Sequence, residues 1–472
     1  MNTKRMLSAL IALVMLLSTM LAAGCTAPSQ PAPGNNDPQN TQGSAGLNTQ
    51  KPSQAASGEM LLAAPEELEF VKYPEMTDWN DDEMELYELW NKSAEARRQA
   101  GVDPNEIAGF TAELTRELVS GAGDNLVWSP VNVYIALAML AEVTDSETRA
   151  QILNILGASG MDALRGNVTA LLTADNFDDG QTASLMADSL WLRNGFVFNT
   201  DTVEKLAEIY RASSYWGDPC DEAFNEALRS WLKENTGGLL DDSANEIKFN
   251  PETVLAICSA IYFKGGWDQK FAKELTCEED FHSPEGEVKC QMMHKTTNED
   301  IYFEGEGFTA VWEKIPASGN GVWFLLPDEG KSVEDMLASS DFIGILSGKA
   351  YGESEVEIAF SMPKIDIKAD LDLIPALKEL GMTDCFDPSV SDFSPLSPYS
   401  NGLYVSKIAH SARIKTDEEG IEAAAFTVIM VDEYCAMPQK QISFTLDRPF
   451  ALVITGVTGA PLFVGVVNTP GV

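Results

Sequence analysis

The amino-acid sequence predicts an α+β fold. Helical patterns dominate the first half of the globular part, strand patterns dominate the second half, and no alternating βαβ rhythm connects them. The chain closes with two apolar runs, residues 450–457 and 462–467, joined by a short segment at residues 458–461. Two such runs around a turn predict a buried antiparallel hairpin near the C-terminal end.

The composition limits the classes of function. The 472 residues suffice for one large or two ordinary domains, and 44% of them are hydrophobic, enough for a sizeable core. A mean hydropathy of -0.10 argues against a polytopic membrane protein. With 32 basic and 72 acidic residues, the net charge is -40. Because nucleic-acid phosphates are bound by clustered lysines and arginines, this charge excludes nucleic acid as a partner class.

The first 25 residues resemble an export signal. A short basic region precedes an apolar run at residues 6–21, which is shorter than the ~20 residues of a bilayer span. Residues 21–24 (LAAG) stand directly before Cys25, and this pattern resembles a bacterial lipobox. The resemblance implies that residues 1–24 are a lipoprotein signal peptide and that the Cys25 thiol is acylated. A plain secretory signal and a single anchoring helix are the alternatives, and all three place the mature protein outside the cytoplasm.

Two further segments precede the globular domain. Residues 25–58 are rich in Pro, Gln, Asn, Gly, Ser and Thr, a composition that predicts a disordered low-complexity tether. Residues 59–102 form an acidic N-terminal extension, which we predict to be helical because helical patterns run through residues 66–118. The acidity is densest between residues 66 and 88, which predicts a solvated acidic surface.

Helices and strands follow in order along residues 103–472. Apolar residues recur near helical spacing from 105 to 119, and residues 134–142 are apolar on most faces, which predicts a buried helix. Further helices are predicted at residues 146–173, 201–236 and 371–380. Strands are predicted at residues 125–129, 254–263, 321–326 and 356–362.

Cysteine and histidine spacing predicts no metal centre and no cofactor. The seven cysteines contain no C-x-x-C pair. The three histidines match no metal-binding motif; they are His282, His294 and His410. Cys277 and Cys290 flank a predicted hairpin whose turn is residues 283–286, so a cross-strand disulfide and two free thiols are both open.

Enzyme motifs are absent from the sequence, which predicts that the protein is not an enzyme. There is no G-x-S-x-G elbow for a nucleophilic serine. Residues 330–332 (GKS) look like the end of a phosphate-binding loop, but Leu325 occupies the position that requires glycine.

Several blocks of residues 103–472, taken in order, resemble the serpin family. They are residues 125–130 (NLVWSP), 260–267 (AIYFKGGW), 362–365 (MPKI), 418–425 (EEGIEAAA), 447–450 (DRPF) and 465–468 (GVVN). The resemblance implies a serpin fold, in which helices pack on three β-sheets and a reactive-centre loop, here about residues 418–447, is exposed. It also implies an inhibitor that acts as a suicide substrate: a target protease cuts the loop, is trapped as an acyl-enzyme, and the loop inserts into the large sheet.

The start of this loop looks like the hinge that inserts. The hinge residues are Glu418, Glu419, Gly420, Ile421, Glu422, Ala423, Ala424 and Ala425. From this window alone a helix is equally plausible, because acidic residues precede a run of alanines. Strand alternation puts Ile421, Ala423, Ala425 and Thr427 on one face, which family geometry turns to the core. Small side chains suit a segment that must slip between two existing strands.

The family register places the scissile bond at Tyr434–Cys435, which suits a chymotrypsin-like protease. Bonds after Val431, Cys435 or Met437 are alternatives that suit elastase-like proteases. No basic residue lies between Lys415 and Lys440, so a trypsin-like target is not expected.

Two further residue sets match family positions that control insertion. Ser129, Asn132, Ser259 and His410 match a hydrogen-bonded cluster, the shutter, beneath the sheet, with serine and asparagine exchanged between two positions. An ordinary buried histidine is the alternative for His410. Trp267, Lys364 and Glu418 match the breach, where the loop first enters the sheet.

The resemblances together imply a monomeric, envelope-anchored extracellular inhibitor of serine proteases, held to the membrane by lipid on Cys25. One alternative is a non-inhibitory serpin that acts as a binding or carrier protein. Another is a cross-class inhibitor of cysteine proteases that uses the same loop.

Overall fold

The computed structural model describes most of the globular part of the chain. The described residues are 60–74, 80–119, 123–240, 245, 247–298, 300–316, 319–350, 352–354, 356–421 and 440–471. All of them belong to the unit Gln54–Val472. Cys25, the hinge residues 422–425 and the candidate reactive-bond residues lie outside the described residues; the latter are Val431, Tyr434, Cys435 and Met437.

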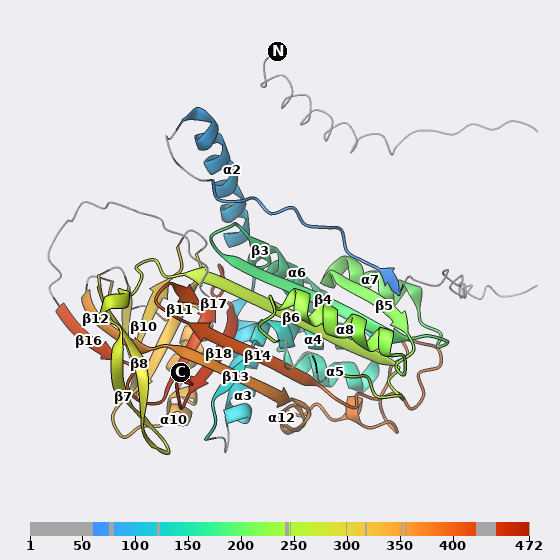
Figure 1. Ribbon diagram of the computed structural model, residues 1–472. Coiled ribbons are helices and arrows are strands. Elements are labelled where there is room, and N and C mark those ends of the chain that lie inside the picture. The colour runs from blue at the N-terminus through green and yellow to red at the C-terminus, as the bar shows by residue number, and fades with distance from the viewer. Residues whose placement is uncertain are drawn as a thin grey trace, which may run out of the picture. The chain divides into compact units, whose positions relative to one another are not determined.

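The described strands form three sheets, as expected (Figure 1). The large sheet has the order β1-β5-β4-β6-β15-β14-β13, with β3 paired to β4. Its strands are β1 (Leu61–Ala63), β3 (Phe177–Asp178), β4 (Ala183–Arg193), β5 (Ala212–Gly217), β6 (Leu255–Gly266), β13 (Ile365–Asp372), β14 (Ala409–Thr416) and β15 (Gly420–Ile421).

The other two sheets are smaller. The six-stranded sheet runs β2 (Leu126–Trp128), β18 (Pro461–Val467), β17 (Phe450–Thr455), β11 (Gly321–Pro327), β10 (Phe308–Lys314) and β9 (Ile301–Gly305). The four-stranded sheet runs β16 (Lys440–Thr445), β12 (Val356–Pro363), β8 (Gly286–Thr297) and β7 (Cys277–Ser283). The predicted C-terminal hairpin is β17–β18, and every residue of both strands is buried.

Helices cover the sheets. The described helices are α2 (Asp81–Arg98), α3 (Pro104–Val119), α4 (Pro130–Glu142), α5 (Ser146–Ile155), α6 (Met161–Asp175), α7 (Thr200–Tyr210), α8 (Glu222–Asn235), α10 (Val333–Leu337), α11 (Ser340–Leu346) and α12 (Ile374–Glu379), with short 3₁₀ turns at Lys273–Leu275 and Asp384–Phe386. None of these helices has the length and apolar character needed to cross a membrane.

The buried helix predicted at residues 134–142 is confirmed as α4. Ser129 caps it, accepting a hydrogen bond from the Asn132 N–H, and Pro130 opens its first turn. The helix contacts β6 of the large sheet and β18 of the six-stranded sheet, so it forms core between them. In Figure 1, α8 lies in front of β6 and α4 lies behind it.

Two predicted helical stretches are wrong in part. Residues 201–236 contain β5 between α7 and α8, because Arg211 adopts a left-handed conformation (φ 53°) that ends α7. The described part of the N-terminal extension is helical only in α2: β1 pairs with β5 at the edge of the large sheet, and residues 64–74 are neither helix nor strand. Pro65 and Pro74 lack the N–H that a continuous helix would need.

The predicted hairpin around residues 283–286 is β7–β8, and it contains no disulfide. Cys277 faces Met292 and Cys290 faces Glu279, so the two cysteines are not cross-strand partners. Both are free thiols. The disulfide alternative is therefore wrong for this pair.

Candidate functional site: the loop hinge and the large sheet

The described part of the hinge already lies in the large sheet. Strand β15 consists of Gly420 and Ile421 and stands between β6 and β14. Gly420 pairs with Gly266 and Ile421 with Gly265 on β6, while Ile421 also pairs with Thr416 on β14. The chain that leads into the loop therefore begins as a sheet strand.

Beyond β15, β6 and β14 are not neighbours in the described sheet. Strand β6 has 12 residues and β14 has eight, yet the two-residue β15 is the described strand that connects them. Residues 255–259 of β6, which have no described partner on this side, are only half-buried, whereas residues 188–192 of β4, which face them on the other side, are buried. Unpaired ladder groups on two facing strands can accept an additional strand.

Gly420 fits its position because it has no side chain. A Cβ atom there would lie 2.3 Å from the Gly265 carbonyl oxygen and 2.7 Å from the Gly266 Cα. The next residue, Ile421, is only 4% exposed and packs in the main hydrophobic core. The side-chain alternation inferred from the sequence puts Ile421 on the core face, and the burial of Ile421 agrees with this.

Ion pairs hold the two glutamates that precede β15. Glu418 Oε1 lies 2.8 Å from Lys364 Nζ and accepts a 2.9 Å hydrogen bond from the Thr276 hydroxyl. Burial opposes ionisation of Glu418, but hydrogen bonds from Lys364 and Thr276 keep its pKa below the usual value. The Glu419 carboxylate lies 2.7 Å from Lys270 and 2.9 Å from Lys273, and these contacts lower its pKa to about 2.

Backbone contacts add to this anchoring. Trp267 donates from its backbone N–H to the Glu419 carbonyl (3.1 Å) and from its indole to the Asp417 carbonyl (2.7 Å). The Phe271 N–H donates to the Glu418 carbonyl at 3.1 Å. The breach residues Trp267, Lys364 and Glu418 thus all contact or belong to the segment that enters the sheet.

Sequence reasoning missed four of these partners: Thr276, Phe271, Lys270 and Lys273. The two lysines carried a usable signal, since they follow Trp267 closely in a strongly acidic chain.

Three of the four shutter residues form a connected group. His410 Nε2 accepts a 2.9 Å hydrogen bond from the Ser129 N–H, and Ser129 Oγ accepts from the Asn132 N–H at 3.3 Å. Burial lowers the pKa of His410 to about 4, so the imidazole is neutral at physiological pH.

Ser259 lies elsewhere in the sheet. It faces Asp188 across the β4–β6 pair, and its side chain hydrogen-bonds that carboxyl group. Among the described contacts, none links Ser259 to Ser129, Asn132 or His410. Burial raises the pKa of Asp188 to about 7, a perturbed group that sequence reasoning did not single out.

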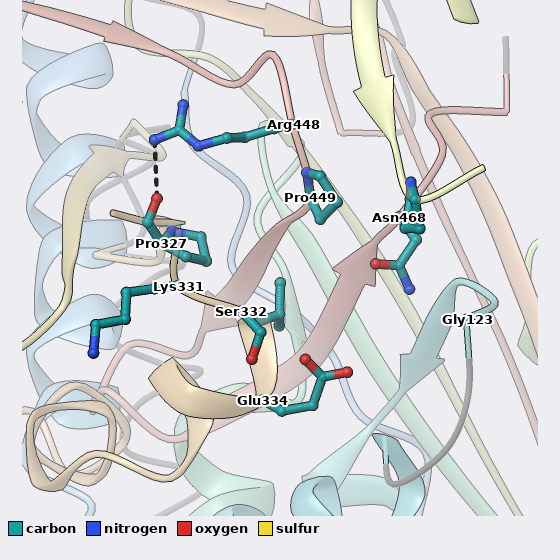
Figure 2. A pocket seen from close by; sticks show the side chains of 10 residues that line it. Gly123, Pro327, Lys331, Ser332, Glu334, Arg448, Pro449 and Asn468 are labelled. Carbon is teal, nitrogen blue, oxygen red and sulfur yellow. Dashed lines mark hydrogen bonds between the residues drawn. The ribbon is translucent and has the colours of Figure 1, made fainter. Parts of the chain in front are cut away.

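A shallow pocket of about 420 Å³, whose lining includes no described hinge residue, is shown in Figure 2. It contains Lys331 and Ser332 of the incomplete phosphate-loop pattern. Figure 2 shows Arg448 turned toward Pro327, to whose carbonyl it donates at 2.9 Å, while the Lys331 amine points away from it. The two cations therefore do not converge on one point as a phosphate cradle would require.

Comparisons with known proteins agree with this architecture. A family model described as Serpin (serine protease inhibitor) matches residues 105–470. Serpin B6 of Bos taurus is 32% identical over 369 residues, covering 75% of this chain and 96% of that protein. A serpin-like protein of Thermococcus kodakarensis is 31% identical over 378 residues, covering 78% and 85%.

A solved structure extends the likeness to three dimensions. The thermophilic serpin tengpin, in its native state, has a TM-score of 0.69 at 26% identity, covering 78% of this chain and 94% of tengpin.

Proposed function

The chain belongs to the serpin family, whose members are typically protease inhibitors, and on this premise we propose that it traps serine proteases as covalent acyl-enzymes. The target's serine oxygen attacks the carbonyl carbon of the residue before the scissile bond. The C–N bond breaks, the new amine takes a proton, and an ester joins the protease to the loop. The protease supplies the catalysis, and this chain supplies the loop that is cleaved and the strand that inserts.

The observation that carries this proposal is the position of β15 between β6 and β14. The loop begins in the sheet where two described residues, Gly420 and Ile421, stand between these two strands. Insertion of about a dozen residues adds on the order of ten ladder hydrogen bonds, each worth ~1 kcal/mol net. Because a protease is stable by only about 5–15 kcal/mol, this gain is large enough to distort a trapped active site.

The target class is part of the proposal. We place the scissile bond at Tyr434–Cys435, with bonds after Val431, Cys435 or Met437 as alternatives. A tyrosine before the cut suits a chymotrypsin-like pocket, and the smaller apolar residues suit an elastase-like one.

The location is proposed from the N-terminal sequence. The lipobox-like residues before Cys25 support export, removal of residues 1–24 and anchoring by lipid to the outside of a bacterial membrane. On this proposal the inhibitor acts as a monomer in the extracellular space and meets secreted proteases there.

The test incubates the full chain, held in detergent, with chymotrypsin and with pancreatic elastase. We expect a complex that survives a denaturing gel and a released fragment that begins at Cys435. A complex with a different fragment moves the bond and keeps the mechanism. Clean cleavage by both proteases, without a complex and without a gain in thermal stability, would overturn the inhibitory proposal in favour of a binding or carrier role.

A matched pair of variants tests insertion itself. Because Ile421 faces the core, an inserted strand turns Ala423 to the core and Ala424 outward. The substitution Ala423→Glu should convert the inhibitor to a substrate and raise the stoichiometry of inhibition roughly tenfold or more, because burying an unpaired carboxylate costs several kcal/mol. Ala424→Glu adds the same charge and should leave the stoichiometry nearly unchanged. Equal effects of the two would contradict strand insertion in this register.

A further inference from the structure

Three metal-binding side chains converge on the β7–β8 hairpin. Cys277 and Glu279 are two residues apart on β7, so they share one face. His294 lies two residues beyond Met292, the cross-strand partner of Cys277, and therefore shares that face. Their ligand atoms all lie within 4.8 Å of one another. The spacing along the sequence concealed this group because its members come from two paired strands.

The separations match the edges of a metal tetrahedron. Cys277 Sγ lies 3.6 Å from His294 Nε2 and 3.4 Å from Glu279 Oε1, and the last two atoms are 3.1 Å apart. Zinc with Zn–S ~2.3 Å, Zn–N ~2.0 Å and Zn–O ~2.0 Å in tetrahedral geometry separates its donors by roughly 3.3–3.6 Å. An ion can therefore contact all three atoms with small side-chain adjustments.

A fourth residue orients the imidazole. Ser361 on β12 is the cross-strand partner of His294, and its Oγ lies 2.8 Å from His294 Nδ1. When Nδ1 donates to this hydroxyl, Nε2 is left unprotonated and points to the thiol and the carboxylate. Metal-ligating histidines are held in this way by a hydrogen bond at their other nitrogen.

The same trio does not suit a thiol nucleophile. The Cys277 Sγ lies 3.4 Å from the Glu279 carboxylate, and a neighbouring anion disfavours the thiolate that a nucleophilic cysteine needs. The carboxylate also approaches the same imidazole nitrogen as the thiol, so it cannot orient the ring from the opposite side as in a catalytic triad. A cation placed among the three groups removes this crowding of electron-rich atoms.

We propose that Cys277, Glu279 and His294 bind a transition-metal ion of the Zn²⁺ class, with Ser361 as a positioning residue and water at the fourth place. Binding releases the thiol proton, and the metal–sulfur bond forms in its place. The side chains of Glu279 and His294 are 41% and 29% exposed, so an ion can enter from solvent. The site adjoins Thr276, whose hydroxyl contacts Glu418 of the hinge.

The test titrates the reduced, metal-free full chain with Co²⁺ alone and then displaces Co²⁺ with Zn²⁺. We expect a thiolate-to-cobalt charge-transfer band and strong visible bands of four-coordinate cobalt, with one ion bound per chain. Zn²⁺ should also raise the midpoint of thermal unfolding in proportion to the logarithm of its concentration.

Variants identify the ligands. Cys277→Ser and His294→Gln should each weaken Co²⁺ binding by more than about 100-fold, and Ser361→Ala by about 10–100-fold. Ser361→Thr, which keeps the hydroxyl, should restore binding. Cys220→Ser removes another exposed thiol and is the matched control, expected to bind like the wild type. A wild type without the charge-transfer band, or a band that survives either Cys277→Ser or His294→Gln, overturns the site whatever the outcome of the protease experiments.

Discussion

At the scale of single residues, the hinge depends on the missing side chain of Gly420 and on the ion pairs of Glu418 and Glu419. The glycine lets two backbones approach closely, while the carboxylates hold the preceding turn against Lys364 and Lys270. Since the Glu418 side chain is only 7% exposed, its ion pair is less screened than a surface pair. These residues therefore anchor the described start of the hinge in the large sheet.

The substitution Gly420→Ala should dislodge β15. Its Cβ would overlap the Gly265 carbonyl, and such overpacking costs about 1–3 kcal/mol. We expect a lower midpoint of urea unfolding and faster hydrogen exchange at Gly265 and Gly266. Gly166→Ala is the control, because its Cβ would meet open space in α6, where alanine favours helix. Indistinguishable exchange in the two variants would contradict the close approach.

His410 should make the fold sensitive to acid. Its pKa is about 4 in the fold and about 6.5 when unfolded, so the unfolded chain binds the proton more readily between these values. The stabilising contribution is present above pH 6.5 and is lost as the pH falls toward 4, a change of up to about 3 kcal/mol. His410→Gln keeps an acceptor for the Ser129 N–H and should flatten the curve of unfolding free energy against pH over this window. A curve that His410→Gln leaves unchanged would refute the assignment.

At the scale of elements, β6 of the large sheet is paired along most of its length on one side and, among the described residues, at only two positions on the other. Strand β4 pairs with β6 over ten residues, from Ala183–Lys264 to Leu192–Leu255. On the other side of β6 the described partner is β15, which pairs at Gly265 and Gly266. A strand that enters there meets the rest of β6, from Leu255 to Lys264, next to the Asp188–Ser259 pair that ties β6 to β4.

Asp188 should oppose the stability of this strand pair at high pH. Burial raises its pKa from 3.8 to about 7, so the folded state holds the proton more tightly than the unfolded chain. Its contribution is fully present below pH 3.8 and is lost as the pH rises through 7. At pH 8, Asp188→Asn should therefore be more stable than the wild type by up to about 4 kcal/mol, with little gain at pH 4. Urea unfolding at both pH values measures this, with the exposed Asp328→Asn as control; an equal gain at pH 4 would contradict the ionisation argument.

The sequence patterns predicted the helices and strands better than they predicted the contacts between them. The run at residues 134–142 is apolar on most faces, which is why α4 could be identified as buried. The strand β5 could not be found, because the left-handed turn at Arg211 that separates it from α7 has no glycine to mark it. The partners of the hinge glutamates were also hidden, since Thr276 and Glu418 are brought together by packing across 142 positions of sequence.

At the scale of the whole molecule, the fold could be predicted because many blocks occur in family order along residues 103–472. No single block predicts the fold, since the hinge window alone is also compatible with a helix. The sequence pattern alone does not contain the register between paired strands. Ser259 lies opposite Asp188, and Cys277 lies close to His294, only because the strands pair in this register.

On the proposed function, the net charge of -40 should govern which proteases are inhibited fastest. A strongly acidic surface attracts a cationic protease over long range and raises its association rate, whereas it repels an anionic one. Because salt shortens the Debye length to about 10 Å at 0.1 M, the second-order rate constant of inhibition should fall with ionic strength for a cationic protease and rise for an anionic one. Stopped-flow inhibition from low to high salt measures both constants, and hydrolysis of a small neutral peptide by each protease corrects for salt effects on the protease itself. The same sign of salt dependence for both proteases would mean that local contacts at the loop, and not the field of the whole chain, control the encounter.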